Sequence, residues 1–302
     1  MNQTPQLDTV LAEICARWSI PGLGVGIVKD GEIIYARGFG VQSLETGAPV
    51  TPDSIFCVAS ITKCFVACAV MQLVEQGKLN LDAPLVTYLP EFRLADDRFR
   101  LITLHQVLSH TSGMPDMDET AYDELVANPE YDEGAPSRYV SALANLRLIA
   151  SPGKRFAYSN IAYNVLGYLI ARVSGKTFEE YMKACILLPA GMTGSTLFFP
   201  GVRRECLAVP HLRTPAMAVN PIYPYHRADA PASFLHSSVI EMCRWCITCL
   251  NRGEYGGQRL LSPASYDQMW TPVAEWGYPP FYEHIGLGWT LGHFDGYLTA
   301  AV

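Results

Sequence analysis

The stretch SITKCFVACAVMQLVEQG, residues 60–77, decides the fold of this chain. Its apolar residues recur at helical spacing from Ser60 to Gln76, and Gly77 is a helix terminator, so the pattern predicts a helix. Positions i and i+3 share one helix face, which brings the Ser60 hydroxyl within reach of the Lys63 amine. At the start of the helix, the positive end of the macrodipole also favours an alkoxide on Ser60. A lysine kept neutral by burial and by cationic neighbours could then take the hydroxyl proton.

The Ser-x-x-Lys spacing is by itself a weak signal, because the chain repeats it at Ser151-Pro-Gly-Lys154. Pro152 and Gly153 predict a turn there, and a turn does not present both side chains on one helix face. The pair that begins at Ser60 instead lies in a predicted apolar helix. A lysine on the buried side of such a helix is unusual and indicates a functional role. The sequence therefore favours chemistry at the first pair over the second.

A second constellation, Tyr158-Ser-Asn160, follows a Pro-Gly turn and precedes a predicted helix. Of the 16 tyrosines, only this one is followed two residues later by asparagine. A phenol beside cations can lose its proton or relay one between nucleophile and leaving group, and the asparagine amide can hold Lys63 and a substrate carbonyl. The alternative is structural: Ser159 or Asn160 caps the next helix, and Tyr158 packs as an aromatic ring. Together with the Ser60 pair, the catalytic interpretation becomes the better one.

Strand patterns lie at both ends of the chain, and helical patterns lie between them. Residues 22–37 predict a hairpin with a Lys-Asp-Gly turn, which also excludes a dinucleotide-binding loop at GLGVG, because no helix follows those glycines. Residues 286–302 predict a second hairpin that turns at Asp295-Gly296. The predicted helices, most of them bounded by Gly, Pro or Ser, span residues 7–18, 103–109, 137–149, 160–174, 178–188 and 238–251.

This order of elements predicts an α/β fold of layered α+β type. Both termini, residues 1–58 and 237–302, build one domain around a sheet. A mainly helical domain, residues 59–236, is inserted between them.

The composition excludes several classes of protein. The 302 residues are 49% hydrophobic and carry a net charge of −7, which excludes a disordered chain. With 22 Lys+Arg against 29 Asp+Glu and no basic run, we expect no nucleic-acid partner. The longest apolar run, Cys64 to Met71, falls well short of the roughly 18 residues of a membrane helix. The polar N-terminus shows no secretion signal, so we expect a soluble, cytoplasmic protein without a membrane partner.

Nine cysteines, an odd and scattered set, fit a reducing compartment. Three of them, Cys243, Cys246 and Cys249, have a spacing that an iron–sulfur or zinc site could use. They lie inside the predicted helix 238–251, where positions i, i+3 and i+6 form one buried stripe, and no fourth Cys or His follows nearby. We therefore predict core packing there, with no metal and no other cofactor.

Two further segments have alternative interpretations. Residues 101–137 carry eight acids and no Lys or Arg, which is typical of a solvated surface or of a lid over a cleft. Residues 270–284 are rich in aromatic side chains, which line a pocket or cover the edge of a core. The sequence leaves both choices open.

The two constellations resemble the serine β-lactamase and penicillin-binding protein superfamily, in its branch of class C β-lactamases, D-amino-acid peptidases and β-lactamase-like esterases. Further segments with the same resemblance are Gly77-Lys-Leu-Asn-Leu-Asp-Ala-Pro-Leu85, Tyr88-Leu-Pro-Glu-Phe92, Leu108-Ser-His-Thr-Ser-Gly113, Pro152-Gly-Lys-Arg-Phe-Ala-Tyr-Ser-Asn160 and Gly286-Leu-Gly-Trp289. The resemblance covers roughly residues 20–300. It implies a β-lactamase/transpeptidase-like fold, with an antiparallel sheet flanked by helices.

The resemblance also assigns roles to the residues of both constellations. It implies that Ser60 is the acylated nucleophile, Lys63 its base partner and Tyr158 the proton relay. Asn160 is then the anchor for substrate and lysine, and the backbone N–H of Ser60 is one half of the oxyanion hole. The expected ligand is a small molecule with an acyl group, and no cofactor is implied.

The chain departs from the superfamily in its third motif, Lys-Thr-Gly or His-x-Gly, on a strand beside the nucleophile. His110-Thr-Ser-Gly113 matches a different superfamily segment, and His293-Phe-Asp-Gly296 has the wrong spacing and falls in a turn. The motif is expected after the second hairpin, so the last strands of the sheet are expected to be missing here. Loss of one oxyanion donor typically lowers a rate about 10²–10³-fold. It also leaves a terminal strand edge through which chains could assemble.

The sequence thus predicts a serine hydrolase that acts on an ester, a D-amino-acid amide or a β-lactam through an acyl-Ser60 intermediate. Because no signal peptide is visible and thiols are abundant, an esterase or peptidase is favoured over a periplasmic antibiotic-resistance enzyme. The alternatives are an acyltransferase with a non-water acceptor, and a catalytically weak or inert binding or scaffold protein that keeps the fold.

Overall fold

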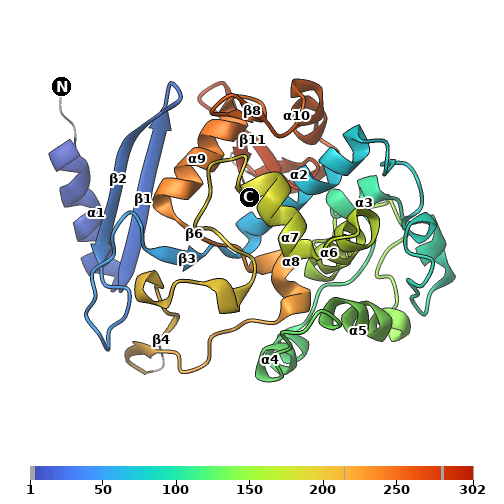
Figure 1. Cartoon of the computed structure of the whole chain (residues 1–302), viewed down its shortest axis with the longest axis horizontal. Coiled ribbons are helices and arrows are strands. Elements are labelled where there is room, and N and C mark those ends of the chain that lie inside the picture. The colour runs from blue at the N-terminus through green and yellow to red at the C-terminus, as the bar shows by residue number, and fades with distance from the viewer. Residues whose placement is uncertain (1–3, 214, 280–281, 302) are drawn as a thin grey trace.

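The structure, a computed structural model, describes residues 4–213, 215–279 and 282–301. Figure 1 shows an N-terminal helix and hairpin at one end of the long axis, a helical body at the other end, and helix α9 (Val239–Leu250) between them. A four-stranded sheet from the C-terminal part lies behind helix α2 (Thr62–Glu75) in this view. These layers of helices and antiparallel strands confirm the predicted fold class.

The N-terminal hairpin forms as its turn chemistry predicts. Strands β1 (Gly22–Lys29) and β2 (Glu32–Gly40) pair antiparallel. The two residues between them, Asp30 and Gly31, have φ values of 53° and 78°. Two consecutive positive φ values belong to a type I′ turn, whose twist matches that of the flanking strands.

The glycines of β1 let helix α9 approach the strand closely. A Cβ atom on Gly24 would lie 2.5 Å from Val239 Cγ2, and one on Gly26 would lie 2.3 Å from Cys243 Sγ. Both distances are too short for a carbon contact, so only glycine fits under the helix at these positions. The GLGVG sequence therefore serves helix–strand packing.

The C-terminal sheet has the strand order β12-β11-β10-β9, all antiparallel. Its strands are β9 (Ala274–Tyr278), β10 (Tyr282–Ile285), β11 (Thr290–Phe294) and β12 (Tyr297–Ala301). Asp295 and Gly296, with φ values of 50° and 80°, form the predicted turn between β11 and β12. His293, expected in that turn, instead belongs to β11, because the turn needs only two residues.

The strands from the two termini form two sheets, where the prediction was one. Among the described residues, neither β1 nor β2 pairs with a strand of the C-terminal sheet. An apolar cavity of about 460 Å³ lies between them, lined by β1, α9 and β12.

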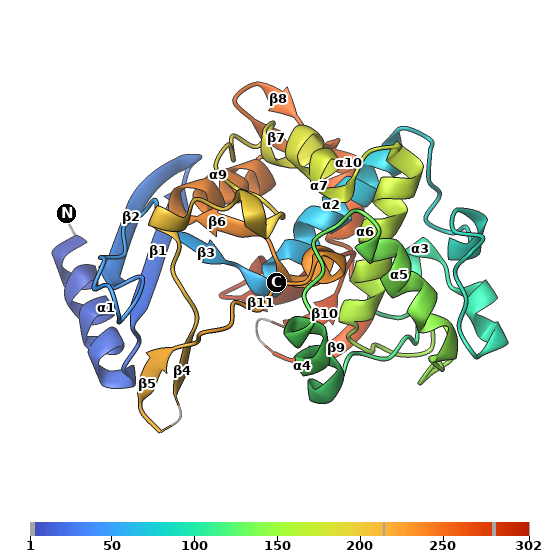
Figure 2. The same cartoon turned by 60° about the horizontal axis from the view of Figure 1, so that its bottom comes forward.

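Helix α2 forms the centre of the helical body. Every residue from 62 to 71 is buried, and Gly77, with a φ of 68°, lies just past its end as predicted. Helix α6 (Asn160–Ser174) packs beside α2 in Figures 1 and 2 and has the predicted bounds. Gly175 ends it in the left-handed conformation, with a φ of 71°. The two helices bring the two sequence constellations together.

The remaining elements are short, apart from the N-terminal helix. They are α1 (Thr4–Trp18), α3 (Leu104–Leu108), α4 (Glu119–Ala127), α5 (Ala135–Ala142), α7 (Phe178–Met182), α8 (Ala230–Ser233), α10 (Pro263–Met269), and the strand pairs β3 (Ile55–Cys57) with β6 (His236–Ser238), β4 (His211–Arg213) with β5 (Met217–Val219), and β7 (Glu254–Tyr255) with β8 (Gln258–Arg259). No helix in the described ranges has both the length and the apolar character to cross a membrane.

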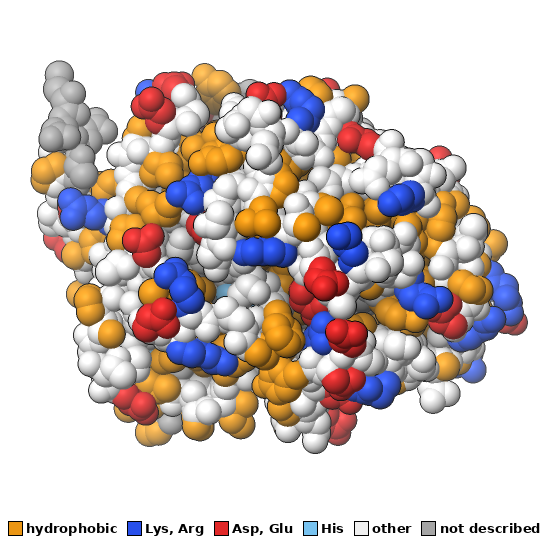
Figure 3. Space-filling model, viewed as in Figure 1, with side chains coloured by type: hydrophobic (Ala, Val, Ile, Leu, Met, Phe, Trp, Pro, Cys, Tyr) orange, Lys and Arg blue, Asp and Glu red, His pale blue; other side chains and the backbone are white. Residues whose placement is uncertain are grey.

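Side chains of both charges are interspersed over the face of the molecule that Figure 3 shows. The division into two domains stays a prediction.

Two helices end well before their predicted last residues. The helix predicted over residues 137–149 is α5, which is followed by one 3₁₀ turn. Leu146 is extended because its carbonyl accepts a hydrogen bond from Ala95 N–H at 2.8 Å, a tertiary contact that local sequence does not show. The helix predicted over residues 178–188 is α7 followed by a π-helical turn, Lys183–Leu187.

The cysteines of α9 form a stripe that is only partly buried. Cys243 and Cys249 are buried, whereas Cys246 is exposed, which corrects the prediction of one buried stripe. All three cysteines line the apolar cavity between α9, β1 and β12, and Cys246 is the one of them whose side chain is exposed. Within the described residues, no three or more His, Cys, Asp or Glu side chains are grouped so that they could hold a metal ion.

Candidate active site

Ser60 lies in the 3₁₀ turn Ala59–Ile61, two residues before the first residue of α2. Ala59 has a φ of 47°, an uncommon left-handed value for a residue with a side chain, so the backbone turns sharply at the serine. The Thr62 hydroxyl secures this turn, since it donates to the Ala59 carbonyl at 2.6 Å and accepts from Leu235 N–H at 3.0 Å. The half-buried Ser60 therefore stands at the positive end of the helix.

Lys63 is almost fully buried, with 2% of its surface exposed. Its Nζ donates to Ser60 Oγ at 2.9 Å, to Asn160 Oδ1 at 2.7 Å and to the Ala232 carbonyl at 2.9 Å. These three contacts hold the amine beside the serine oxygen.

The protonation state of Lys63 follows from its burial. Loss of water disfavours the ammonium and lowers the pKa of Lys63 to about 7, although the carboxylates of Asp229 and Asp116 act in the opposite direction. A large fraction of the amine is therefore neutral near neutral pH. A neutral amine in contact with a hydroxyl can act as its base.

Tyr158 contacts the same serine oxygen. Its hydroxyl lies 2.7 Å from Ser60 Oγ, and its ring centroid lies 4.8 Å from Lys63 Nζ. Burial raises the pKa of Tyr158 to about 12, although the hydrogen bond with Ser60 lowers it. The phenol therefore keeps its proton at neutral pH, which favours a proton relay over a phenolate base.

Asn160 is the first residue of α6, and Ser159 caps that helix by accepting from Ala162 N–H at 3.1 Å. The structural interpretation thus holds for Ser159, and it leaves the Asn160 amide free to contact Lys63. The structure brings the four predicted side chains into one hydrogen-bonded cluster around the Ser60 hydroxyl.

His110 also belongs to this cluster, although the sequence marked it only as part of a superfamily segment. Its ring stacks on that of Tyr158 with the centroids 4.5 Å apart, and its Nδ1 accepts from Ser159 N–H at 3.1 Å. Burial, together with the charge of Lys63, lowers the pKa of His110 to about 3. The ring is therefore neutral and can accept that hydrogen bond, which fixes the segment that carries Tyr158.

The sequence does not predict that two carboxylates lie near the amine, because their contacts span long stretches of chain. Asp229 is 1% exposed, and its Oδ1 accepts from Asn164 Nδ2 at 2.7 Å. Burial raises the pKa of Asp229 to about 7. Asp116, from the acidic segment, accepts from the backbone N–H and the side-chain Nδ2 of Asn160, at 2.8 Å and 3.2 Å. Both carboxylates influence the charge of Lys63.

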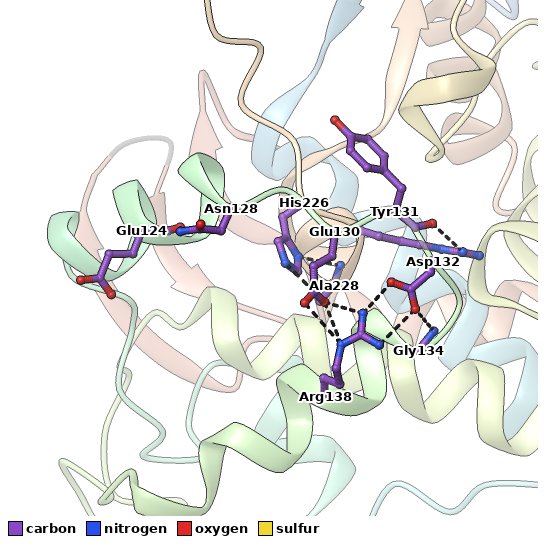
Figure 4. Close-up of polar contacts among 10 residues, drawn as sticks. Glu124, Asn128, Glu130, Tyr131, Asp132, Gly134, Arg138, His226 and Ala228 are labelled. Atoms are coloured by element: carbon purple, nitrogen blue, oxygen red, sulfur yellow. Dashed lines mark hydrogen bonds and ion pairs between the residues drawn. The ribbon is translucent and has the colours of Figure 1, made fainter.

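The later part of the acidic segment is attached to the helical body. Figure 4 shows Arg138 between Glu130 and Asp132, and its Nη2 donates to both carboxylates, at 2.8 Å and 2.6 Å. Arg227 donates to the Tyr131 carbonyl at 2.9 Å. Solvated surface and lid both stay predictions for this segment.

The aromatic segment 270–284 contains residues that fit each of its two interpretations. Trp276 of β9 stands beside the site, with its ring centroid 6.2 Å from that of Tyr158. Trp270 instead packs edge to face against Trp289 at 5.7 Å, at the edge of the core. Residues 280–281 of this segment lie outside the described residues.

Known proteins are similar to this chain in sequence. A family model described as Beta-lactamase matches residues 7–300. The chain is 35% identical over 218 residues to Esterase EstB of Burkholderia gladioli, which covers 68% of this chain and 54% of the esterase. It is 26% identical over 247 residues to Protein flp of Staphylococcus aureus (strain NCTC 8325 / PS 47), which covers 82% of this chain and 49% of that protein. The chain spans about half the length of these curated relatives.

Solved structures are similar over almost the whole chain. The octameric penicillin-binding protein homologue from Pyrococcus abyssi has a TM-score of 0.84 at 29% identity, covering 97% of this chain and 66% of that one. The D-amino acid amidase from Ochrobactrum anthropi SV3, complexed with D-phenylalanine, has a TM-score of 0.82 at 19% identity, covering 100% of this chain and 84% of that one. At that lower identity the likeness shows the fold alone.

Proposed function

Because the chain belongs to the beta-lactamase family, we propose that it is a serine hydrolase that works through an acyl intermediate on Ser60. The family match confirms the resemblance to the serine β-lactamase and penicillin-binding protein superfamily. One observation carries the proposal: Ser60 Oγ contacts both Lys63 Nζ, at 2.9 Å, and the Tyr158 hydroxyl, at 2.7 Å. A nucleophile, a base and a proton relay in direct contact are the requirements for acyl transfer.

Acylation would begin at the Ser60 hydroxyl. Neutral Lys63 takes its proton while Oγ forms a bond to the substrate carbonyl carbon. The negative charge that develops on the carbonyl oxygen is stabilised by the backbone N–H of Ser60 and the positive end of α2. The intermediate then collapses, the bond to the leaving group breaks, and the leaving oxygen or nitrogen receives the proton through Tyr158.

Deacylation would use the same groups in reverse. A water molecule attacks the acyl carbon, and its proton passes to the Tyr158–Lys63 pair. The bond to Ser60 Oγ breaks, and Oγ regains a proton from that pair. Asn160 keeps Lys63 in reach of the serine through both steps, because its Oδ1 holds the amine at 2.7 Å.

We favour an ester as the substrate. The relative with 35% identity is an esterase by name, which supports this choice. Trp276, half-buried beside Tyr158, offers an apolar surface for part of the ester. D-Amino-acid amides and β-lactams are the other substrates to be compared.

The test is a hydrolysis profile of the purified protein with p-nitrophenyl acetate, D-alanine p-nitroanilide and a chromogenic cephalosporin. We expect turnover of the ester above the other two, abolished by Ser60→Ala. Ser151→Ala, in the second Ser-x-x-Lys copy, should keep the wild-type rate. No turnover of any substrate by the folded protein would overturn the hydrolase proposal in favour of a binding or scaffold role. A rate that increases with added alcohol or amine would instead indicate an acyltransferase.

A further inference from the structure

Asp116 connects the acidic segment to the candidate site. It is one of the eight acids of residues 101–137, and its side chain is exposed at the N-terminal end of α6. There it contacts Asn160 twice: Oδ1 accepts from the backbone N–H at 2.8 Å and Oδ2 accepts from the side-chain Nδ2 at 3.2 Å. Asn160 in turn presents its Oδ1 to Lys63 Nζ at 2.7 Å.

The orientation of the Asn160 amide decides whether it can hold Lys63. An amide has an accepting oxygen on one side and a donating NH₂ on the other, and the two orientations are similar in shape. Lys63 Nζ donates to the amide oxygen at 2.7 Å, and the NH₂ side of the amide has no acceptor for that N–H. A carboxylate can only accept when it is ionised, so Asp116 selects the orientation in which Nδ2 faces it and Oδ1 faces Lys63.

We propose that Asp116 is a positioning residue that fixes the Asn160 amide so that its oxygen holds Lys63 against Ser60. This inference rests on the proposed function, in which Lys63 is the base for Ser60. Asp116 touches neither Lys63 nor Ser60 through a hydrogen bond, and its hydrogen bonds lead to Lys63 through Asn160.

The competing explanation is that Asp116 merely stabilises the start of α6. That helix already has a cap, since Ser159 Oγ accepts from Ala162 N–H at 3.1 Å and donates to the Pro115 carbonyl at 2.7 Å. A capping role also predicts that asparagine would replace Asp116 well, because asparagine is as good as aspartate at helix starts. The positioning role predicts the opposite, because asparagine has one accepting oxygen for the two N–H groups of Asn160, so its own NH₂ must face one of them.

The experiment compares Asp116→Asn with the wild type in hydrolysis of p-nitrophenyl acetate. We expect kcat to fall about 10- to 100-fold, the effect of misplacing a reacting group by a fraction of an ångström to an ångström, with Tm unchanged. Asp118→Asn is the matched control, because Asp118 accepts from Ala121 N–H at the start of α4 and has no contact with Asn160. It should keep the wild-type kcat.

A double-mutant cycle tests the route of the effect. In an Asn160→Ala background there is no amide to orient, so Asp116→Asn should cause no further loss of kcat. Additive losses, or an Asp116→Asn variant with wild-type kcat, would overturn the inference. An Asp116→Asn variant with a lower Tm but a wild-type kcat would point to the capping role and would also overturn the inference.

A second measurement separates this inference from the proposed function. In NMR spectra of Asp116→Asn, the flipped amide should give nuclear Overhauser contacts between the Asn160 NH₂ protons and the Lys63 ε-protons that the wild type lacks. The readout needs no substrate. A protein that hydrolysed nothing would therefore contradict the hydrolase proposal, while identical amide contacts in both proteins would contradict the positioning role of Asp116.

Discussion

Ser60 and Lys63 have the same spacing as Ser151 and Lys154, yet the structure surrounds the two pairs differently. Lys63 is 2% exposed, and its Nζ contacts the hydroxyl of its serine at 2.9 Å. The Tyr158 hydroxyl contacts the same oxygen at 2.7 Å. The Ser60 hydroxyl and the Lys63 amine thus belong to one hydrogen-bond network.

The second pair lies in a surface turn, as its Pro-Gly centre predicts. Gly153 has a φ of 78°, and the Lys154 N–H donates to the Ser151 carbonyl at 3.2 Å. The Lys154 side chain is exposed, and the Ser151 hydroxyl is a partner of Arg98 Nη1 at 2.9 Å. The amine of this second pair is therefore open to water and has no contact with its serine hydroxyl like that of Lys63 with Ser60.

The comparison teaches that burial and neighbours, rather than spacing, make a Ser-x-x-Lys motif reactive. A helix presents both side chains on one face, whereas a turn does not. Burial then changes the acid–base chemistry of the lysine, because a low-dielectric environment disfavours the charged form.

Replacement of each lysine in turn should give the largest difference in activity between the two pairs. Lys63→Met keeps the apolar stem but removes the base, so kcat/KM for an ester should fall about 10³–10⁴-fold. Lys154→Met should leave kcat/KM within about twofold of the wild type, as for most surface changes. Steady-state kinetics of both variants check this. Comparable losses in the two would break the contrast between the pairs.

Tyr158→Phe should have the next largest effect. The ring can still stack on His110, but the hydroxyl that contacts Ser60 at 2.7 Å is lost, so kcat should fall about 10²-fold. Tyr168→Phe is the control, since the Tyr168 hydroxyl donates to Glu91 at 2.8 Å on the surface. If stopped-flow acylation rates were equal for the two variants, Tyr158 would have no part in proton transfer.

The pH dependence of kcat/KM should report the buried lysine. The pKa of Lys63 is lowered to about 7, and only its neutral form is a base, so the rate should rise about tenfold per unit below pH 7 and level off above it. Asp229 and Asp116 raise this pKa, so Asp229→Asn should move the acidic limb to lower pH. A profile that rose only near pH 10, the range of an exposed lysine, would contradict the account.

Asp229→Asn should also raise stability at alkaline pH. Burial raises the pKa of Asp229 to about 7, so the unfolded chain releases this proton at lower pH than the folded one, and stability is lost as the pH rises from about 4 to 7. The variant removes that penalty, and its new NH₂ can pair with the unpartnered Asn164 Oδ1. We expect a gain of up to about 4 kcal/mol in the free energy of unfolding at pH 8 and less at pH 4.

The surface pair offers the matched comparison for stability. Ser151→Ala should change the free energy of unfolding by no more than about 0.5 kcal/mol at either pH. Urea denaturation at both pH values measures the two variants side by side. An Asp229→Asn gain that was equal at pH 4 and pH 8 would show that ionisation of this carboxyl is not its cause.

The sequence could predict what local chemistry determines. The Asp30-Gly31 turn, the Asp295-Gly296 turn and the bounds of α6 follow from glycine, capping and periodicity signals a few residues long. The four side chains of the candidate site also follow from the sequence, since each belongs to a short motif at the start of one of two helices.

Long-range contacts account for what the sequence could not predict. Asp116 reaches Asn160 across 44 residues, and Ala232 accepts from Lys63 across 169, so no local pattern marks either. The early end of α5 depends on a tertiary hydrogen bond to Leu146. Among the described residues, the lack of pairing between the strands of the two termini is likewise a long-range property.

The most direct test of the central claim is intact-protein mass spectrometry after incubation with a fluorophosphonate probe. An activated serine oxygen forms a bond to phosphorus, fluoride leaves, and the mass increases by one adduct. We predict one adduct on the wild type and on Ser151→Ala, and none on Ser60→Ala. An adduct that persisted in Ser60→Ala, or no adduct on the folded wild type, would contradict the claim that Ser60 is the activated serine of this protein.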